Sequence, residues 1–172
     1  VQITPKKNEK RVPLNIQDLI IKLYSDKKYY SNIEIKDDTK IRNDLGLNNL
    51  TLSEKDIKSI SDDEVLVEMK AAALNYRDLI MIDGGYGPIG GTPPFIPISD
   101  GAGIVKEVGK SIKNFKVNDV VIPPFFKGWD SGNMNEDTVF SSLGGKEDGV
   151  MQEFMIFKEK NLVHAPKNWS CT

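Results

Sequence analysis

A series of short apolar segments, separated by glycine, proline and aspartate, is the feature that most constrains the fold of this chain. Four segments show the alternating or β-branched pattern that is typical of strands, and they cover residues 64–69, 103–108, 119–122 and 150–157. The glycine and proline residues between them favour turns. The sequence has no strand, helix, strand repetition, which argues against a doubly wound parallel sheet. We therefore predict a mainly β fold with short helices, arranged as a closed or half-closed barrel.

One segment among these strands has helical character. Residues 71–82 are apolar and end at the breaker sequence Asp83-Gly84-Gly85, so we expect a helix there. Residues 88–97 contain four prolines and are expected to form a surface loop. The stretch 123–149 is too long for an ordinary connection, which indicates either a functional lid or a mobile insertion. Three aromatic side chains favour the lid, unless they plug the end of the barrel. They are Phe125, Phe126 and Trp129.

The N-terminal part of the chain has a different pattern. Residues 1–11 are polar and basic, as in a solvated arm. Apolar residues then recur at helical spacing over residues 16–23, with Asn15 at the N-cap position, which predicts a short amphipathic helix. We assign residues 1–38 to an N-terminal extension with this one helix and residues 39–172 to the main domain. The apolar face of the helix covers either that domain or a partner.

Length, charge and residue usage exclude several classes of protein. The 172 residues, with a mass of 19.2 kDa, suit one domain or a domain with an appendage. With 23 basic and 25 acidic residues, the chain has no overall basic field for nucleic acid, and no apolar stretch is long enough to span a membrane. Cys171 and His164 are the single cysteine and histidine, so a disulfide framework and a closed Cys/His zinc site within the chain are excluded. The N-terminus has no charged and apolar leader, so we expect a cytoplasmic location.

Two motifs resemble phosphate-binding loops only superficially. Gly101-Ala102-Gly103 is followed by Lys106 where a dinucleotide fingerprint has its third glycine, and a strand is predicted there instead of a helix. Gly145-Lys146 is followed by Glu147 where a Walker A motif has the hydroxyl that binds Mg²⁺. If the protein uses a redox cofactor, another segment must therefore bind its phosphates.

Four stretches of the sequence resemble one known domain. They read EVLVEMKAAALNYRDL over residues 64–79, PISDGAGIVKEVG over 97–109, FKVNDVV over 115–121 and GVMQEF over 149–154. In order and spacing they resemble the N-terminal GroES-like domain of medium-chain dehydrogenase/reductases, over roughly residues 40–170. The resemblance implies a partly open β-barrel. It also implies that the Rossmann domain, which binds NAD or NADP in that family, is missing from this sequence, so we expect no tight cofactor binding by this chain.

The resemblance also bears on zinc. The zinc-dependent members of the family have a cysteine where Asn75 stands and a His-Glu pair where Ser99 and Asp100 stand. Amide and hydroxyl oxygens do not replace a thiolate and an imidazole on Zn²⁺. We therefore expect no zinc, as in the zinc-independent quinone oxidoreductase and enoyl reductase relatives.

Hydride transfer without a metal needs hydrogen-bond donors near the oxygen that gains charge. Our candidate catalytic residues are Asn75, Tyr76, Asp78 and Asp100. The resemblance implies that Asn75 and Tyr76 also face the cofactor. Asp78 either pairs with Arg77 or caps backbone amides, and Asp100 is expected to organise the floor of the cleft. Tyr86 is either a turn residue or a further acid.

Two classes of function remain open from the sequence. The first is the substrate-side domain of an NAD(P)-dependent, zinc-independent reductase that acts on an activated carbonyl or alkene of a small molecule. The second is a non-catalytic binding module, in which the helix over residues 16–23 docks a partner, or an inactive fragment.

Overall fold

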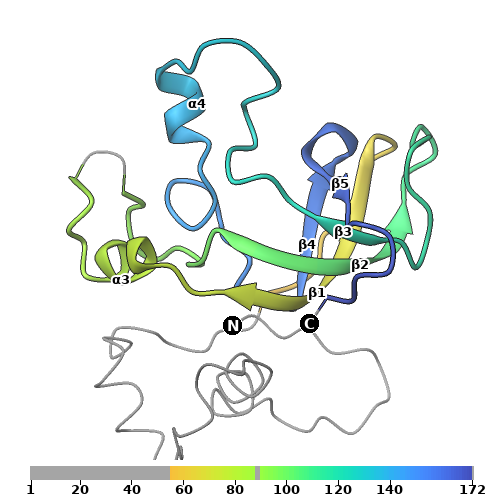
Figure 1. The fold of residues 1–172 in the computed structure, drawn as a ribbon, viewed down its shortest axis with the longest axis horizontal. Coiled ribbons are helices and arrows are strands. Elements are labelled where there is room, and N and C mark those ends of the chain that lie inside the picture. The colour runs from red at the N-terminus through yellow and green to blue at the C-terminus, as the bar shows by residue number, and fades with distance from the viewer. Residues whose placement is uncertain (1–54, 88–89, 172) are drawn as a thin grey trace, which may run out of the picture.

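Five strands form one antiparallel sheet in the computed structural model, which describes residues 55–87 and 90–171 (Figure 1). Their spatial order is β4 (Phe154–Lys158), β1 (Glu64–Ala73), β2 (Asp100–Val108), β3 (Val120–Ile122) and β5 (Val163–His164). The helices of the described residues are α3 (Tyr76–Ile82), α4 (Glu136–Phe140) and the 3₁₀ helix η3 (Glu159–Asn161). In this part of the chain no helix has the length and apolar character needed to cross a membrane. The predicted extension over residues 1–38 lies outside the described residues.

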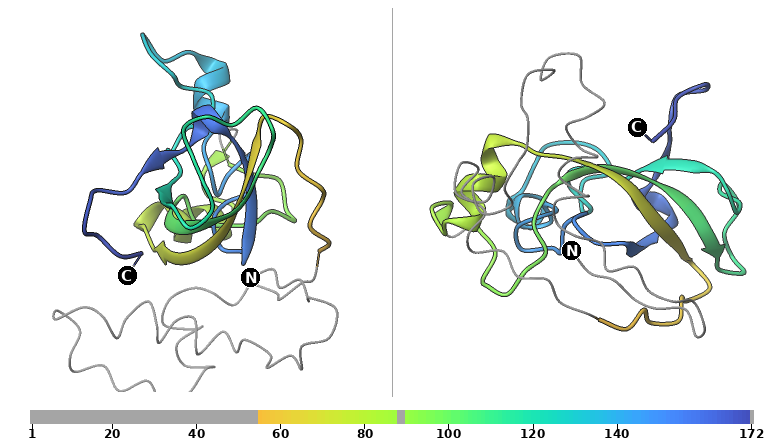
Figure 2. Two further views of the ribbon diagram at one scale, coloured as in Figure 1. Left: turned by 90° about the vertical axis from the view of Figure 1, so that its right-hand side faces the viewer. Right: turned by 90° about the horizontal axis from the view of Figure 1, so that it is seen from below.

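The long strands β1 and β2 hold the sheet together. β1 pairs with β2 on one side and with β4 on the other, so its backbone is bonded along both edges. Alternate side chains of β1, Val65 and Val67, are fully buried, and Val105 of β2 and Val121 of β3 join them in one apolar core. Figure 2 shows that the sheet is twisted and curved. The prediction of a mainly β fold with short helices and a partly open sheet is confirmed.

The helix predicted over residues 71–82 begins later than expected. Ala71, Ala72 and Ala73 continue β1, where they pair with Ala102, Gly101 and Asp100 of β2, and α3 starts only at Tyr76. Alanine has a high helix propensity, but these three residues are held by a neighbouring strand whose small residues allow close approach. As a consequence, the last residue of β1, Ala73, lies beside Asp100.

The strand predicted over residues 150–157 is also displaced. β4 begins at Phe154, whereas the backbone N–H groups of Val150 and Met151 donate to the carbonyls of Ile98 and Pro97 at 2.8 and 3.2 Å. One alternating stretch of the sequence therefore forms hydrogen bonds with two different segments. The first half of the segment supports the chain before β2, and only the second half joins the sheet.

The two long loops are partly buried. The proline-rich stretch predicted as a surface loop ends in buried residues, because Pro97 lies inside with Ile98 and Ser99. The stretch 123–149 contains α4 and divides into an exposed part over residues 128–137 and a buried part over residues 142–145. The buried part belongs to the body of the domain, and for the exposed part the lid and the insertion both stay predictions.

Candidate functional site

Asn75 and Asp100 meet where β1 ends and β2 begins. Asn75 is the N-cap residue of α3, and its Nδ2 donates a hydrogen bond to Oδ2 of Asp100 at 2.6 Å. The hydroxyl of Ser99 donates to the same carboxylate oxygen at 2.7 Å. The pairing of Ala73 with Asp100 in the sheet explains this contact, because it brings the ends of two strands together. Two predicted site residues, 25 positions apart in the sequence, thus form one polar cluster.

Asp78 lies beneath this cluster and is completely buried. Its Oδ2 accepts the backbone N–H of Asn75 at 2.8 Å, which is one half of a capping box at the start of α3. Its Oδ1 accepts no hydrogen bond and lies 3.8 Å from the Arg77 guanidinium. Asp78 therefore both caps a backbone amide and faces a cation, so the two alternatives considered from the sequence are both realised.

Burial dominates the ionisation of Asp78. Desolvation is the largest effect and raises the pKa of its carboxyl above the usual value. Hydrogen bonds from the Asn75 and Ser99 backbone amides and the charge of Arg77 lower this pKa, whereas the nearby Asp100 carboxylate raises it. Among the described residues, the charged groups that act on Asp78 are thus one cation on α3 and one carboxylate on β2. A buried carboxyl with an incomplete hydrogen-bond set is costly, and such groups are concentrated at functional sites.

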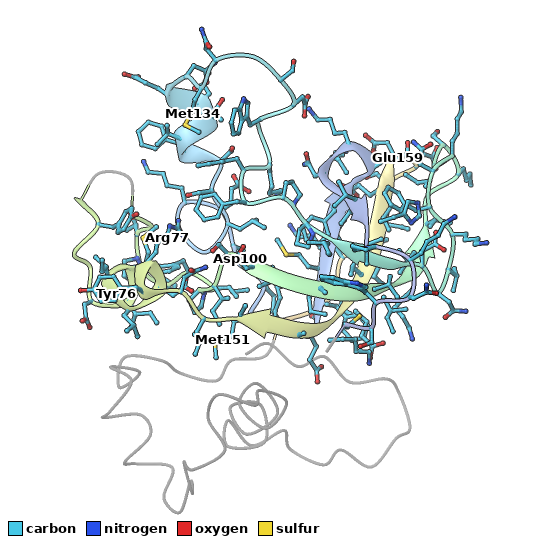
Figure 3. The ribbon with its side chains drawn as sticks, viewed as in Figure 1. Tyr76, Arg77, Asp100, Met134, Met151 and Glu159 are labelled. Carbon is cyan, nitrogen blue, oxygen red and sulfur yellow. The ribbon has the colours of Figure 1, made fainter. Side chains whose placement is uncertain are left out.

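Arg77 links α3 to the buried part of the 123–149 stretch. Its Nη1 donates to the carbonyl of Leu143 and its Nη2 donates to the hydroxyl of Ser142, each at 3.0 Å. The guanidinium also lies over two aromatic rings, with centroid distances of 4.8 Å to Phe125 and 5.5 Å to Tyr86. Figure 3 shows Arg77 beside α3, on the side of the helix that faces α4. Tyr86 is therefore a packing partner of Arg77.

The backbone that leads into Ser99 and Asp100 is strained. Ile98 has a φ of 73°, a left-handed conformation that is unusual for a β-branched residue, and its side chain is buried. Its carbonyl accepts the N–H of Val150, and a Cβ added at Gly149 would lie 2.2 Å from the same oxygen. Close packing against a glycine thus holds Ile98 in this conformation. The turn points Ser99 and Asp100 toward Asn75.

Tyr76 differs from its neighbours in exposure. Its side chain is 79% exposed, next to Asn75 in the sequence and at the start of α3 (Figure 3). Its phenol is a hydrogen-bond donor on the open surface beside the polar cluster. The structure therefore brings Asn75, Asp78 and Asp100 into contact and leaves Tyr76 at their rim, where the roles assigned from the sequence stay predictions.

The donor set of this cluster does not suit zinc. Asn75 and Ser99 contribute an amide and a hydroxyl, and both of them donate hydrogen bonds to Asp100. Zn²⁺ in proteins prefers thiolate, imidazole and carboxylate ligands in a tetrahedral set. The described residues contain no group of three or more histidine, cysteine, aspartate or glutamate side chains that could hold a metal ion.

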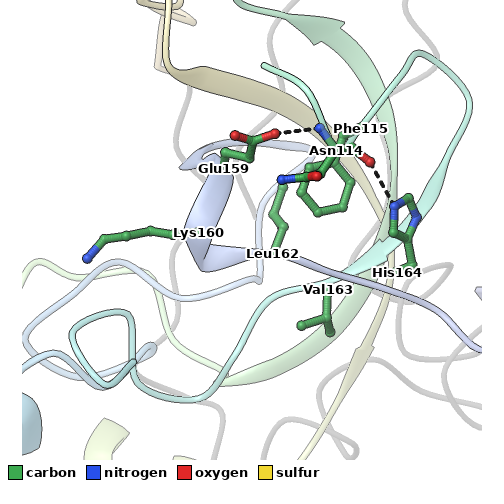
Figure 4. A pocket seen from close by; sticks show the side chains of 7 residues that line it. All are labelled: Asn114, Phe115, Glu159, Lys160, Leu162, Val163 and His164. Atoms are coloured by element: carbon green, nitrogen blue, oxygen red, sulfur yellow. Dashed lines mark hydrogen bonds between the residues drawn. The ribbon is translucent and has the colours of Figure 1, made fainter. Parts of the chain in front are cut away.

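An open pocket lies at the opposite end of the sheet (Figure 4). Its lining residues come from η3, β5 and the loop before β3, and they include Glu159, Phe115 and His164. Glu159 accepts the backbone N–H groups of Lys113 and Asn114, and the His164 ring lies 4.7 Å from the Phe115 ring. Figure 3 places Glu159 far from Tyr76. These contacts tie the loop before β3 to η3 and β5.

Sequence reasoning missed two features of the site. The partners of Arg77 on residues 142–143 carry no motif, because a serine hydroxyl and a backbone carbonyl have no sequence signature. The left-handed conformation at Ile98 was also missed, because isoleucine gives no signal for it. A glycine pattern around residues 144–149 was the available clue, since closely packed backbones need small residues.

Comparison with known proteins agrees with this geometry. The alcohol dehydrogenase GroES-like domain family matches residues 61–167. A zinc-type alcohol dehydrogenase-like protein of Schizosaccharomyces pombe is 42% identical over 113 residues, which cover 66% of this chain and 32% of the relative. The chloroplastic NADPH-dependent alkenal/one oxidoreductase of Arabidopsis thaliana is 31% identical over 112 residues. The match covers 65% of this chain and 26% of that relative.

A solved structure gives the same result. The crystal structure of a putative alcohol dehydrogenase from Sinorhizobium meliloti superposes with a TM-score of 0.59 at 33% identity, over 67% of this chain and 34% of that chain. This chain thus spans about a third of the length of the proteins that it resembles. The matched residues include the whole sheet together with Asn75, Asp78 and Asp100. The chain belongs to the alcohol dehydrogenase GroES-like domain family.

Proposed function

We propose that this chain is the substrate-side domain of an NAD(P)-dependent, zinc-independent medium-chain oxidoreductase that reduces an activated carbonyl or alkene. It works together with a nucleotide-binding domain that would seat the cofactor. The observation that carries the proposal is the contact between Asn75 and Asp100, at 2.6 Å, in a chain whose family match includes both residues. The relative that acts on alkenals and enones supports the substrate class.

Each site residue has a role that follows from its position. When bound, the nicotinamide supplies the hydride. Asp100 fixes the carboxamide of Asn75 at the start of α3, and Asn75 then orients cofactor or substrate groups that reach this edge. Tyr76 offers an exposed O–H to a substrate oxygen that gains negative charge. Asp78 is too deeply buried to touch a substrate and acts by holding the Asn75 backbone.

The zinc-independence in this proposal rests on donor chemistry. Asn75 and Ser99 are neutral groups whose hydrogens already point to Asp100. A Zn²⁺ ion at this cluster would have neither a thiolate nor an imidazole ligand. Stoichiometric zinc in the purified, folded protein, measured by elemental analysis, would contradict this part of the proposal.

A domain exchange tests the proposed activity. Residues 61–167 replace the matching domain of the Schizosaccharomyces pombe relative, and the loss of NADPH absorbance is followed with an enal, an enone and a quinone. We expect turnover of at least one of these compounds. Asn75→Ala should lower kcat/KM about 100-fold, because the positioned amide is lost. Asn114→Ala, which removes an exposed amide at the opposite end of the sheet, is the matched control.

Two outcomes of this exchange count against the proposal. A folded chimera that binds NADPH but turns over none of the three compounds would contradict it. Equal losses for Asn75→Ala and Asn114→Ala would remove Asn75 from the active site.

A further inference from the structure

We propose that Arg77 is a positioning residue, which ties the start of α3 to the buried residues 142–143 and provides the countercharge of Asp78. It thereby holds Asn75 in the orientation that meets Asp100. The inference rests on the proposed function for the use of Asn75. The experiment below needs neither substrate nor cofactor, so the two can fail separately.

α3 has little apolar anchoring. It is a seven-residue helix in which only Asp78 and Met81 are buried. A helix this short is marginal without tertiary contacts, so its place depends on the contacts that its side chains make. Arg77 makes two hydrogen bonds to residues 142–143, and its side chain is only 12% exposed. Since Leu143 is fully buried in the core, this anchor is rigid.

Arg77 also compensates the charge of Asp78. Asp78 is fully buried, its Oδ1 has no hydrogen-bond donor, and the Arg77 Nη1 lies 3.8 Å away. Removing one partner from a buried charge pair leaves an uncompensated charge, which is strongly unfavourable. The two hydrogen bonds to Leu143 and Ser142 hold the guanidinium at a distance where it acts on Asp78 by charge rather than by a direct hydrogen bond.

Asp78 links the contacts of Arg77 to Asn75. The Oδ2 of Asp78 accepts the Asn75 backbone N–H, and the Asn75 side chain donates to Asp100. A shift of α3 or of the Asp78 carboxylate therefore moves Asn75. The planar guanidinium of arginine can bind two acceptors and stack on two aromatic rings at the same time. The compact ammonium group of lysine does not reproduce these contacts. Arginine at this position thus acts through its neighbours without touching the reacting atoms.

The test uses nuclear magnetic resonance on the 172-residue chain. Two quantities are measured for each variant: the pKa of the Asp78 carboxyl group, followed by the chemical shift of its carboxyl carbon, and the hydrogen exchange rate of the Asn75 backbone amide. Arg77→Met should raise the pKa of Asp78 further, because the cation is lost, and should speed exchange at Asn75 about tenfold. Arg77→Lys should bring the pKa of Asp78 back toward the wild-type value but leave exchange at Asn75 fast.

Control variants make the result decisive. Lys127→Met removes a cation that pairs with Glu147 in the same stretch, and it should change neither quantity. Ser142→Ala removes one acceptor of Arg77 without changing any charge, so it should speed exchange at Asn75 even if Arg77→Met fails to fold. Unchanged exchange in Ser142→Ala, or an unchanged pKa of Asp78 in a folded Arg77→Met, would overturn the proposal.

Discussion

Ile98 is the residue at which local preference and tertiary packing oppose each other most directly. An L-residue in the left-handed region costs about 1–2 kcal/mol relative to the right-handed one, and the branched side chain of isoleucine adds to the crowding. The buried side chain and the contacts with residues 149–151 keep it there. The strain is located one residue before Ser99, where a change of direction decides whether Asp100 reaches Asn75.

A pair of substitutions measures this strain. Ile98→Ala and Ile98→Gly both lose the buried side chain, which should lower the free energy of unfolding by about 3 kcal/mol. Only glycine also relieves the strain, so Ile98→Gly should be more stable than Ile98→Ala by about 1 kcal/mol in urea denaturation. Val105 of β2 is equally buried and serves as the control. There the order should be reversed, with Val105→Ala more stable than Val105→Gly. The same order at both positions would show that Ile98 is not strained.

The sequence was more informative about some site residues than about others. Asn75 and Asp100 were identified because they stand in motifs that resemble a known domain, and strand pairing then brings them together. The two alternatives for Asp78 followed from its neighbours in the sequence. The loop partners of Arg77 did not, because a contact 66 residues away between a guanidinium and a backbone carbonyl depends on the fold alone.

At the scale of elements, strand existence was predicted better than strand limits. All four predicted strands are present, but β1 extends through three alanines and β4 loses its first four predicted residues. In both cases the reason is pairing with a distant segment, which outweighs the local propensity of the residues. The site depends on these shifted limits. A β1 that ended at Met69 would not bring Ala73 beside Asp100.

The contact between the segments around residues 98 and 149 should tolerate no side chain. Gly149→Ala places a Cβ 2.2 Å from the Ile98 carbonyl oxygen, so the two backbones must separate. We expect a loss of about 3 kcal/mol in the free energy of unfolding, measured by urea denaturation. Gly85→Ala, whose Cβ would meet a methyl group of Ile80 at 3.1 Å and the Ile80 carbonyl oxygen at an ordinary 3.6 Å, should change it by less than about 0.5 kcal/mol. Similar losses in both variants would contradict the close packing at Gly149.

At the scale of the whole molecule, the architecture predicts that this chain does not bind a dinucleotide tightly. The described sheet is entirely antiparallel, so it contains no pair of parallel strands joined by a helix whose N-terminus could meet a pyrophosphate. We expect calorimetric titration of NADPH into the 172-residue chain to show no binding at micromolar concentrations. Lysozyme at equal concentration serves as the control for heats of dilution. A micromolar Kd would contradict the division of labour proposed here.

The spatial order of the strands also has a consequence for contacts between molecules. The sheet ends in β4 on one flank and in β5 on the other, within the residues described. β5 has two residues, and Pro166, two positions after its end, has no backbone N–H to donate to a neighbouring strand. β4 has five residues with aromatic and branched side chains, and Lys158 at its end is held by Asp63. Any growth of the sheet into fibres or strand-exchanged dimers would therefore start along β4, with Lys158 as the residue that opposes it.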